Sequence, residues 1–422
     1  MKRIFFLLLF YFLINTNFAQ PTSLYLKSTL KFNRDKLYRN LVNYTINKNL
    51  STQLADSTEE NWEDAFTGIE LINYKSLWID GKIKIAMDEI ENHSLSFQRA
   101  LLELSYSNYK NEFYQPVKLL MLQTGDAKIF AMCAAYILQS SHGIEDANFL
   151  SVKTKQQIQK DGQNPIYHLL LYQVENYGKL MQVPDLKPFF EKKYMHGQVL
   201  LFSFQRKNRN YPGIVMVRDR YGNFMRDSTG EYFAVPQLAR SIGNLPPYLT
   251  NGNTPQGIFR MKGYDVSRAG FIGPTVNVQL TMPFEKSPQH FYADSSITDT
   301  SWNISYYIKL LPPPFRNYAP LLQSYYAGKA GRTEIIIHGT TVNPEYYSKQ
   351  SFYPLTPTQG CLTSKEIWNE KTGQRIESDQ QKLINTMIKA GGADGYCIVI
   401  EIDDKNNPVV LEDVRRFLNK AN

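Results

Sequence analysis

The chain of 422 residues is long enough for two or three domains with ample cores. Its three cysteines cannot all pair within one chain, which excludes a fully disulfide-bonded exported protein. The formal net charge of +8 is mild and includes no long basic block, so nothing indicates nucleic-acid binding. A mild positive charge suits an anionic polymer or a membrane face, without deciding between them.

The first residues, MKRIFFLLLFYFLINTNFAQ, have a basic start, an apolar run from Ile4 to about Ile14 and a small residue at Ala19. This pattern predicts a signal peptide over residues 1–19, cleaved after Ala19, and an alternative is an uncleaved anchor. The run is shorter than the roughly 18 residues of a spanning helix. No comparable run follows, so we expect no membrane span after cleavage and a periplasmic or cell-envelope location.

Residues 20–195 are predicted to form an α-helical accessory domain. Apolar residues recur at helical spacing in two stretches, and Thr124-Gly125-Asp126 separates them, with Asp126 as the cap of the second helix. Successive amphipathic helices indicate a helical array, for which stacked hairpins are one arrangement, although no sequence repeat supports a solenoid. The apolar positions are Phe97, Leu101 and Leu104, and then Ile129, Met132, Cys133, Tyr136 and Ile137.

Residues 196–405 are predicted to form a mainly β domain, followed by a C-terminal tail over 406–422. Short β-branched runs such as GQVLLFSF, TVNVQLTM and GYCIVIEI alternate with Gly, Pro and Asn clusters. Ser378 and Gln381 form a capping box for one late helix, which is expected to end before Gly391. The overall prediction is an α+β multidomain chain.

A segment of about 285–332, rich in Pro and Tyr, is predicted to leave the β domain as an insertion. It either flanks a functional site or is a surface insertion without a role in chemistry. Its AGKAGR sequence lacks the spacing of a phosphate-binding loop, which argues against nucleotide binding.

The cysteines differ in their surroundings. Cys133 and Cys397 lie in apolar runs and are predicted to be buried core residues. Cys361 instead follows Gly360, and Thr363 and Glu366 beyond it have the spacing of a capping box. A helix starting near Thr363 is therefore expected to lower the pKa of the Cys361 thiol and make it a nucleophile.

His338 ends the aliphatic strand EIIIH and precedes the turn residue Gly339, a place that suits a general base. The nineteen residues 339–357 are expected to return the chain to the same end of the sheet. The backbone N–H groups of Gly360 and Cys361, with that of Gln359, are candidates for an oxyanion hole. Taken alone, such a His and Cys would be structural, but the Gly-Cys turn and the export signal favour catalysis.

IHGTT followed by TQGCLT resembles the signature of the L,D-transpeptidase (YkuD-type) catalytic domain, and NGNTPQGIFRM over 251–261 is similar to an upstream segment of that family. The resemblance covers about 196–405 and implies a mostly β fold of sandwich character. Papain-like and NlpC/P60-like enzymes have their Cys before their His, so the order here matches neither.

This resemblance implies that Cys361 attacks the carbonyl after the third residue of a peptidoglycan stem peptide, leaving a thioester. His338 would move the protons, with the Gly339 carbonyl orienting its ring, and Thr340, Thr358 and Thr363 would lie at the substrate. An amine acceptor would give a 3-3 crosslink and water would give carboxypeptidase activity. The resemblance implies no metal or organic cofactor.

Two departures from the family pattern concern the substrate. Gln359 stands where the family often has His, and Thr363 stands where it often has Arg or Asn. The alternative hypothesis is a cell-envelope binding protein, with the helical domain recruiting an envelope protein partner. A protease acting on ordinary peptides has no further feature in its favour. The remaining histidines lack metal-ligand spacing and are interpreted as ordinary; they are His93, His142, His168, His196 and His290.

Overall fold

The computed structural model describes residues 24–179 and 182–418. The predicted signal peptide over 1–19 lies outside these residues. Among the helices described, none is both long and apolar enough to cross a bilayer. An N-terminal helical region is followed by a β-rich region, so the α+β class is confirmed.

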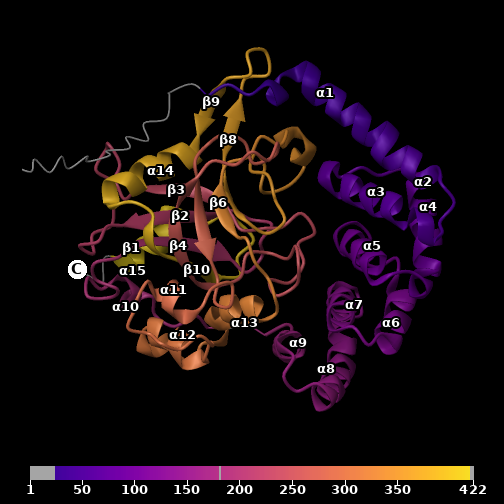
Figure 1. The fold of residues 1–422 in the computed structure, drawn as a ribbon, viewed down its shortest axis with the longest axis horizontal. Coiled ribbons are helices and arrows are strands. Elements are labelled where there is room, and N and C mark those ends of the chain that lie inside the picture. The colour runs from indigo at the N-terminus through magenta and orange to yellow at the C-terminus, as the bar shows by residue number, and fades with distance from the viewer. Residues whose placement is uncertain (1–23, 180–181, 419–422) are drawn as a thin grey trace, which may run out of the picture.

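The helical region curves around one side of the β-rich region (Figure 1). Both predicted helices are present, as α5 and α7, and the Asp126 carboxylate caps α7 by accepting a hydrogen bond from the Ile129 N–H at 2.9 Å. The segment after α1 is a π-helix. The elements are α1 Lys31–Asn40, the π-helix Leu41–Lys48, α2 Asn49–Ser51, α3 Glu59–Ile72, α4 Leu77–Asp88, α5 Leu95–Asn108, α6 Tyr114–Gln123, α7 Ala127–Gln139, α8 Gly143–Lys160 and α9 Pro165–Glu175.

The apolar core of the helical region includes three residues of the β-rich region. α7 is buried on almost every side, as its run of small and apolar residues predicts, and Cys133 lies within it as expected. Leu245, Tyr248 and Leu249, from a loop of the β-rich region, join the same cluster. The two regions are therefore held together by hydrophobic burial as well as by polar contacts.

The eight main strands form one closed barrel in the order β1-β10-β4-β5-β6-β7-β3-β2, so the expected two-sheet sandwich is not what forms. Alternation along a strand predicts its two faces but not its neighbours, so closure was not predictable. A separate hairpin pairs β8 with β9. The strands are β1 Val199–Arg206, β2 Gly213–Arg218, β3 Ala234–Leu238, β4 Gly257–Asp265, β5 Asn277–Thr281, β6 Ile336–His338, β7 Leu362–Ser364, β8 Glu366–Trp368, β9 Arg375–Ser378 and β10 Asp394–Asp403.

Every barrel strand contributes to one buried apolar cluster, which includes Cys397, as expected, and side chains of α14 (Asp379–Ala390). Ser378 caps α14 by accepting from the Gln381 N–H, and Gly391 follows its last residue, as predicted. A second cluster, rich in aromatic residues, packs five short helices against the barrel: α10 Lys187–Phe190, α11 Pro288–Tyr292, α12 Ile304–Leu310, α13 Gln323–Lys329 and α15 Leu411–Leu418.

The predicted insertion and C-terminal tail are both part of this outer packing. α11, α12 and α13 lie within 285–332, and the buried Tyr307 hydroxyl accepts a hydrogen bond from the Ile258 N–H at 2.8 Å. α15 buries Val414 and Leu418, so the segment from 406 to 418 is not a loose tail. Both segments pack against the outside of the barrel.

Candidate active site

β6 and β7 bring His338 and Cys361 to the same part of the barrel. The two strands are parallel neighbours, with Ile337 opposite Leu362 and His338 opposite Thr363. Ile337 and Leu362 belong to the buried cluster of the barrel, so His338 faces the other side. Strand spacing places the Cα atoms of His338 and Cys361 roughly 8 Å apart, as diagonal neighbours. Within the described residues, no hydrogen bond joins their side chains.

His338 is buried in its neutral form and is a weak base. Its side chain is buried, and Nδ1 lies 2.6 Å from the Gly339 carbonyl oxygen. Because a carbonyl only accepts, Nδ1 carries the proton, and the lone pair of the neutral ring is on Nε2. Burial lowers the pKa of His338 to about 4, although the bond to Gly339 acts in the opposite direction. The imidazole is therefore neutral at ordinary pH.

Residue 339 must be glycine, because the Glu366 side chain packs directly against it. A Cβ at this position would lie 2.2 Å from Cδ of Glu366, whose side chain is fully buried. The Glu366 carboxylate accepts from the hydroxyls of Thr275 at 2.7 Å and Ser378 at 2.6 Å, so it is fixed in place. Glycine after His338 therefore lets Glu366 pack beneath the turn.

We expect Gly339→Ala to destabilise the fold by about 2 to 3 kcal/mol, because overpacking displaces either the turn or Glu366. It should also lower turnover, since the Gly339 carbonyl sets the orientation of the His338 ring. Chemical denaturation and a turnover assay measure the two effects. Gly125→Ala is the matched control, because its added Cβ meets nothing within 4 Å. Equal stability of the two variants would contradict this account.

The Cys361 thiol is partly exposed and lies next to two backbone groups. The Ile336 N–H donates to Sγ at 3.5 Å, and Sγ lies 3.7 Å from the Glu334 carbonyl oxygen. Burial raises the pKa of the thiol, whereas the Ile336 N–H and the Arg332 guanidinium lower it, and the Glu334 carboxylate raises it. The net direction is upward, opposite to the expectation from the sequence.

The helix expected near Thr363 is absent from this segment, which is where the prediction was wrong. Leu362–Ser364 is strand β7, paired with β6 on one side and β3 on the other. Pairing on both sides outweighs the local capping-box pattern. Glu366, the expected capping partner, lies in β8 and bonds to Thr275 and Ser378. No helix dipole therefore acts on Cys361.

The expected oxyanion donors already have a partner. The N–H groups of Gly360 and Cys361 both donate to the Thr358 hydroxyl oxygen, at 3.2 and 2.9 Å. The hydroxyl thus lies where these two donors converge, and a substrate oxyanion would have to displace it. Gln359 is exposed. Gly360 has φ +110°, so the turn requires glycine.

Arg332 is the important residue that the sequence did not single out. It is buried, and its guanidinium donates to the carbonyls of Pro247, Gly252 and Asn253. It also lies against Gly360 and close enough to lower the pKa of the Cys361 thiol. It therefore supplies the positive charge that the expected helix does not.

A period-two pattern in the sequence includes this residue. In the stretch RTEIIIH, alternate positions hold Arg332, Glu334, Ile336 and His338. The pattern alone would place all four on one face of a strand, but β6 begins at Ile336, so Arg332 and Glu334 lie before the strand. Glu334 has φ +61°, a left-handed conformation that is costly for a side-chain residue and turns its carbonyl to Sγ.

The three threonines expected at the substrate are not equivalent. Thr340 and Thr363 are buried, and both bond to Thr356 in the loop between β6 and β7. Their hydroxyls stabilise that loop and are not available to a ligand. Thr358 is partly exposed and contacts the Gly360-Cys361 turn directly. Of the three, only Thr358 is placed to meet a substrate.

The upstream segment 251–261 reaches the same turn. The Thr254 hydroxyl donates to the Gly360 carbonyl at 2.9 Å, and the Gly252 carbonyl lies against Gly360. Both parts of the sequence resemblance therefore meet in space, although more than a hundred residues separate them.

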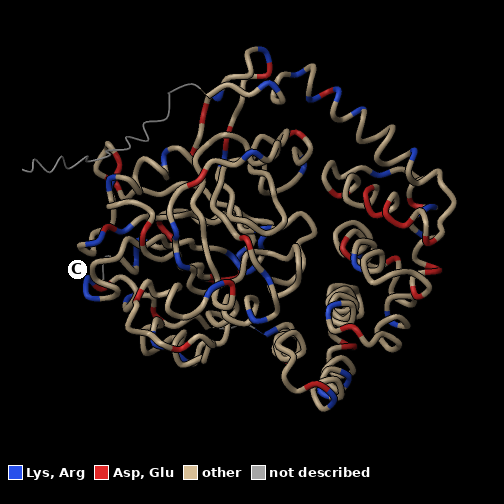
Figure 2. The backbone as a smooth tube through the Cα atoms, viewed as in Figure 1, with Lys and Arg blue, Asp and Glu red and all other residues tan. Residues whose placement is uncertain are grey.

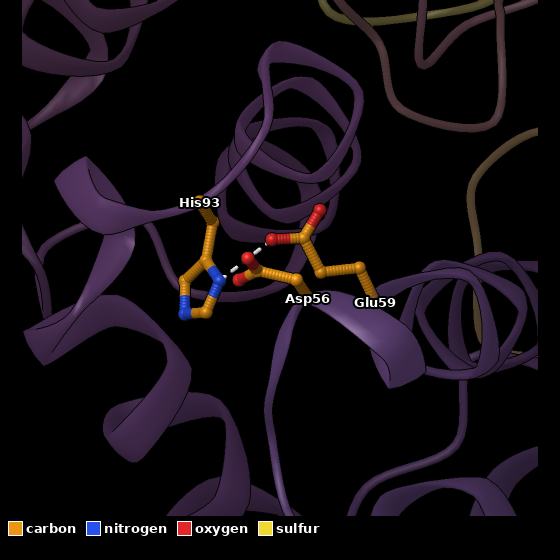
Figure 3. Close-up of side chains that lie close together, drawn as sticks. All are labelled: Asp56, Glu59 and His93. Atoms are coloured by element: carbon orange, nitrogen blue, oxygen red, sulfur yellow. Dashed lines mark hydrogen bonds and ion pairs between the residues drawn. The ribbon is translucent and has the colours of Figure 1, made fainter.

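A different group of polar side chains lies at the start of α3, where acidic residues gather (Figure 2). In the described part of the chain, one group of His, Cys, Asp or Glu side chains has three potential metal-ligand atoms within 4.8 Å of one another. It consists of Asp56, Glu59 and His93. Figure 3 shows His93 Nδ1 turned towards both carboxylates. From the sequence alone, His93 is interpreted as an ordinary histidine, because its partners lie far from it along the chain.

The contacts favour a hydrogen-bonded anchor over a metal site. His93 Nδ1 lies 2.7 Å from Glu59 Oε1, which also accepts from the Ser94 N–H at 3.2 Å. Burial raises the pKa of Glu59, but these hydrogen bonds outweigh it and lower the pKa. His93 Nε2 is buried and has no hydrogen-bond partner in the described part of the chain, whereas a ligating histidine normally donates its second N–H. The group joins α3 to the loop before α5.

Comparisons with known proteins leave the family open. No protein-family model matches the chain, and neither curated proteins nor solved structures gave a significant match.

Proposed function

We propose that the chain is an exported L,D-transpeptidase-like enzyme that acts on peptidoglycan stem peptides through Cys361. The observation that supports this proposal is the grouping of a partly exposed cysteine, a buried arginine and a neutral histidine around β6 and β7. The contact between Thr254 and Gly360 adds support, because it joins the two motifs that carry the resemblance.

The first half-reaction forms a thioester. The Cys361 proton passes to His338 Nε2. The thiolate then attacks the carbonyl carbon after the third stem residue, next to the Arg332 charge. As the tetrahedral intermediate collapses, the C–N bond breaks and His338 returns the proton to the departing D-amino acid. The products are an acylated Cys361 and the free amino acid.

The second half-reaction consumes the thioester. His338 takes a proton from an incoming amine, which attacks the acyl carbon, and the C–S bond breaks. The thiolate regains a proton and Cys361 returns to its starting state. An amine from a neighbouring stem gives a 3-3 crosslink, and water gives a shortened stem.

A second candidate is an envelope binding protein with little catalysis. Two observations favour it: the thiol pKa is raised, and Thr358 occupies the N–H groups of Gly360 and Cys361. In this case the β-rich region would hold stem peptides without cleaving them, and the helical region would recruit an envelope partner.

Mass spectrometry of the protein after incubation with a free tetrapeptide stem distinguishes the two candidates. If the chain is an enzyme, its mass should increase by one tripeptidyl group on Cys361, and the terminal D-amino acid should be released. Binding of the peptide with no adduct, even after acid quenching at short times, would reject the transpeptidase proposal. Cys361→Ala provides the blank.

A further inference from the structure

A large cavity lies where α9 meets the barrel, and it is not lined by Cys361 or His338. Its volume is about 1350 Å³, larger than a typical drug-sized pocket. Its walls come from α9, from the turn Ala319–Leu322 with α13, from the end of β10 and from α15. Figure 1 shows α9 beside α13. Domain junctions of this kind are common ligand sites.

The lining is aromatic, rich in amides and balanced in charge. Tyr248, Tyr318 and Tyr326 present rings, and Gln173, Asn208 and Gln323 present amides. Equal numbers of basic and acidic side chains exclude a strong preference for a polyanion or a polycation. The charged residues are Lys207, Arg209, Arg416, Glu401, Asp403 and Asp404.

One charged pair, Arg209 and Glu401, lies in the wall of the cavity. Arg209 donates to Glu401 Oε1 from Nε at 3.1 Å and from Nη2 at 2.9 Å. The Arg209 side chain is only 4% exposed, yet its Nη1 has no hydrogen-bond partner among the described residues. Burial, and then the Glu401 carboxylate, raise the pKa of Tyr318, so its hydroxyl keeps its proton. Arg209 Nη1 has almost no accessible surface, so a ligand in the cavity would meet mainly the Glu401 carboxylate, which is 21% exposed.

The cavity is connected to the nucleophile by one loop. Pro247 and Asn253 line the cavity, and their carbonyls accept hydrogen bonds from Arg332, which lies against Gly360. A ligand that orders this loop therefore also orders the cation beside Cys361. This loop lines the cavity on one side and contacts the turn at Gly360 on the other.

We propose that this cavity binds a neutral N-acetylated oligosaccharide, the glycan to which the stem peptide is attached. Sugar rings have apolar faces that pack on aromatic rings and hydroxyls that bond to amides and to an Arg-Glu pair. The N-acetyl groups supply carbonyl acceptors for side-chain amides of the wall such as Gln323, and N–H donors for the Glu401 carboxylate. This inference rests on the proposed function, because the glycan is the part of that substrate which the thiol does not touch.

Calorimetric titration of the full chain carrying Cys361→Ala with chitotetraose tests the inference directly. Saturable binding is expected, and Tyr326→Ala should weaken it at least about tenfold through loss of ring contact. Tyr326 is partly exposed, so the variant should fold, and thermal unfolding checks this. Glu401→Gln should also weaken binding, because it releases Arg209. Tyr221→Ala, at an exposed position outside the cavity, should leave binding unchanged.

Three results would overturn the inference: no saturable binding, equal binding of maltotetraose, or binding of the sugar-free stem peptide in the cavity. Chitotetraose binding that the cavity variants do not alter would also overturn it. Acylation of Cys361 by the free stem peptide is measured separately on the wild-type chain. Failure of the glycan site is thus distinguishable from failure of the proposed enzyme.

Discussion

Replacing Cys361 by alanine is expected to reduce turnover of the tetrapeptide stem at least about a thousandfold, the order of loss seen when a nucleophile is removed. The thiol forms the bond that splits the reaction into two steps, and no other described cysteine can replace it. Cys133 and Cys397 are both buried, and burial raises the pKa of each thiol. Release of the D-amino acid, measured by chromatography, gives the rate.

The fold should tolerate this substitution. The Cys361 side chain makes only two long contacts, at 3.5 and 3.7 Å, so the free energy of unfolding should change by less than about 1 kcal/mol. Cys133→Ala is the informative control, since it opens a gap in the helical core without approaching the site. It should lower stability and retain turnover. The reverse pattern would show that Cys361 is structural.

The parts of this fold that depend on local patterns were predictable. Periodicity located α5 and α7, and capping residues located the starts of α7 and α14. The barrel was not predictable, because pairing such as β1 with β10 joins segments almost two hundred residues apart. Local alternation fixes the two faces of a strand and leaves its partners open.

The candidate site was likewise predictable only in part. His338 and Cys361 were selected from short motifs, and the β6-β7 register brings them to one side of the barrel. The helix predicted near Thr363 was wrong, because two neighbouring strands hold that segment extended. Arg332 was missed, since its importance depends on burial against Gly360, which only the packed structure reveals.

The pH dependence of Cys361 alkylation follows from the charges around the thiol. The thiolate is the reactive form, and burial raises the thiol pKa above its usual value near 9. The rate with iodoacetamide should therefore increase about tenfold per pH unit between pH 6 and 8. Because His338 has a pKa of about 4, its titration should add no inflection in this range. Peptide mass spectrometry assigns the alkylation to Cys361.

Two substitutions should move the Cys361 titration curve in opposite directions. Arg332→Met removes the nearby cation, so the thiol pKa should rise and the alkylation rate at neutral pH should fall. Glu334→Gln removes the nearby anion, so the pKa should fall and the rate should rise. Arg332→Met also leaves carbonyls of 247, 252 and 253 without their donor, and it should therefore destabilise the fold.

Arg332→Lys separates these two roles of the arginine. Lysine retains the positive charge but cannot reproduce the fork of donors to the three carbonyls. If the charge sets the thiol pKa, the lysine variant should keep a titration close to that of the wild type while losing stability. A wild-type thiol that titrates below pH 7, or an Arg332→Met curve that does not move, would reject this electrostatic account. Control of the thiolate would then have to come from a group other than Arg332.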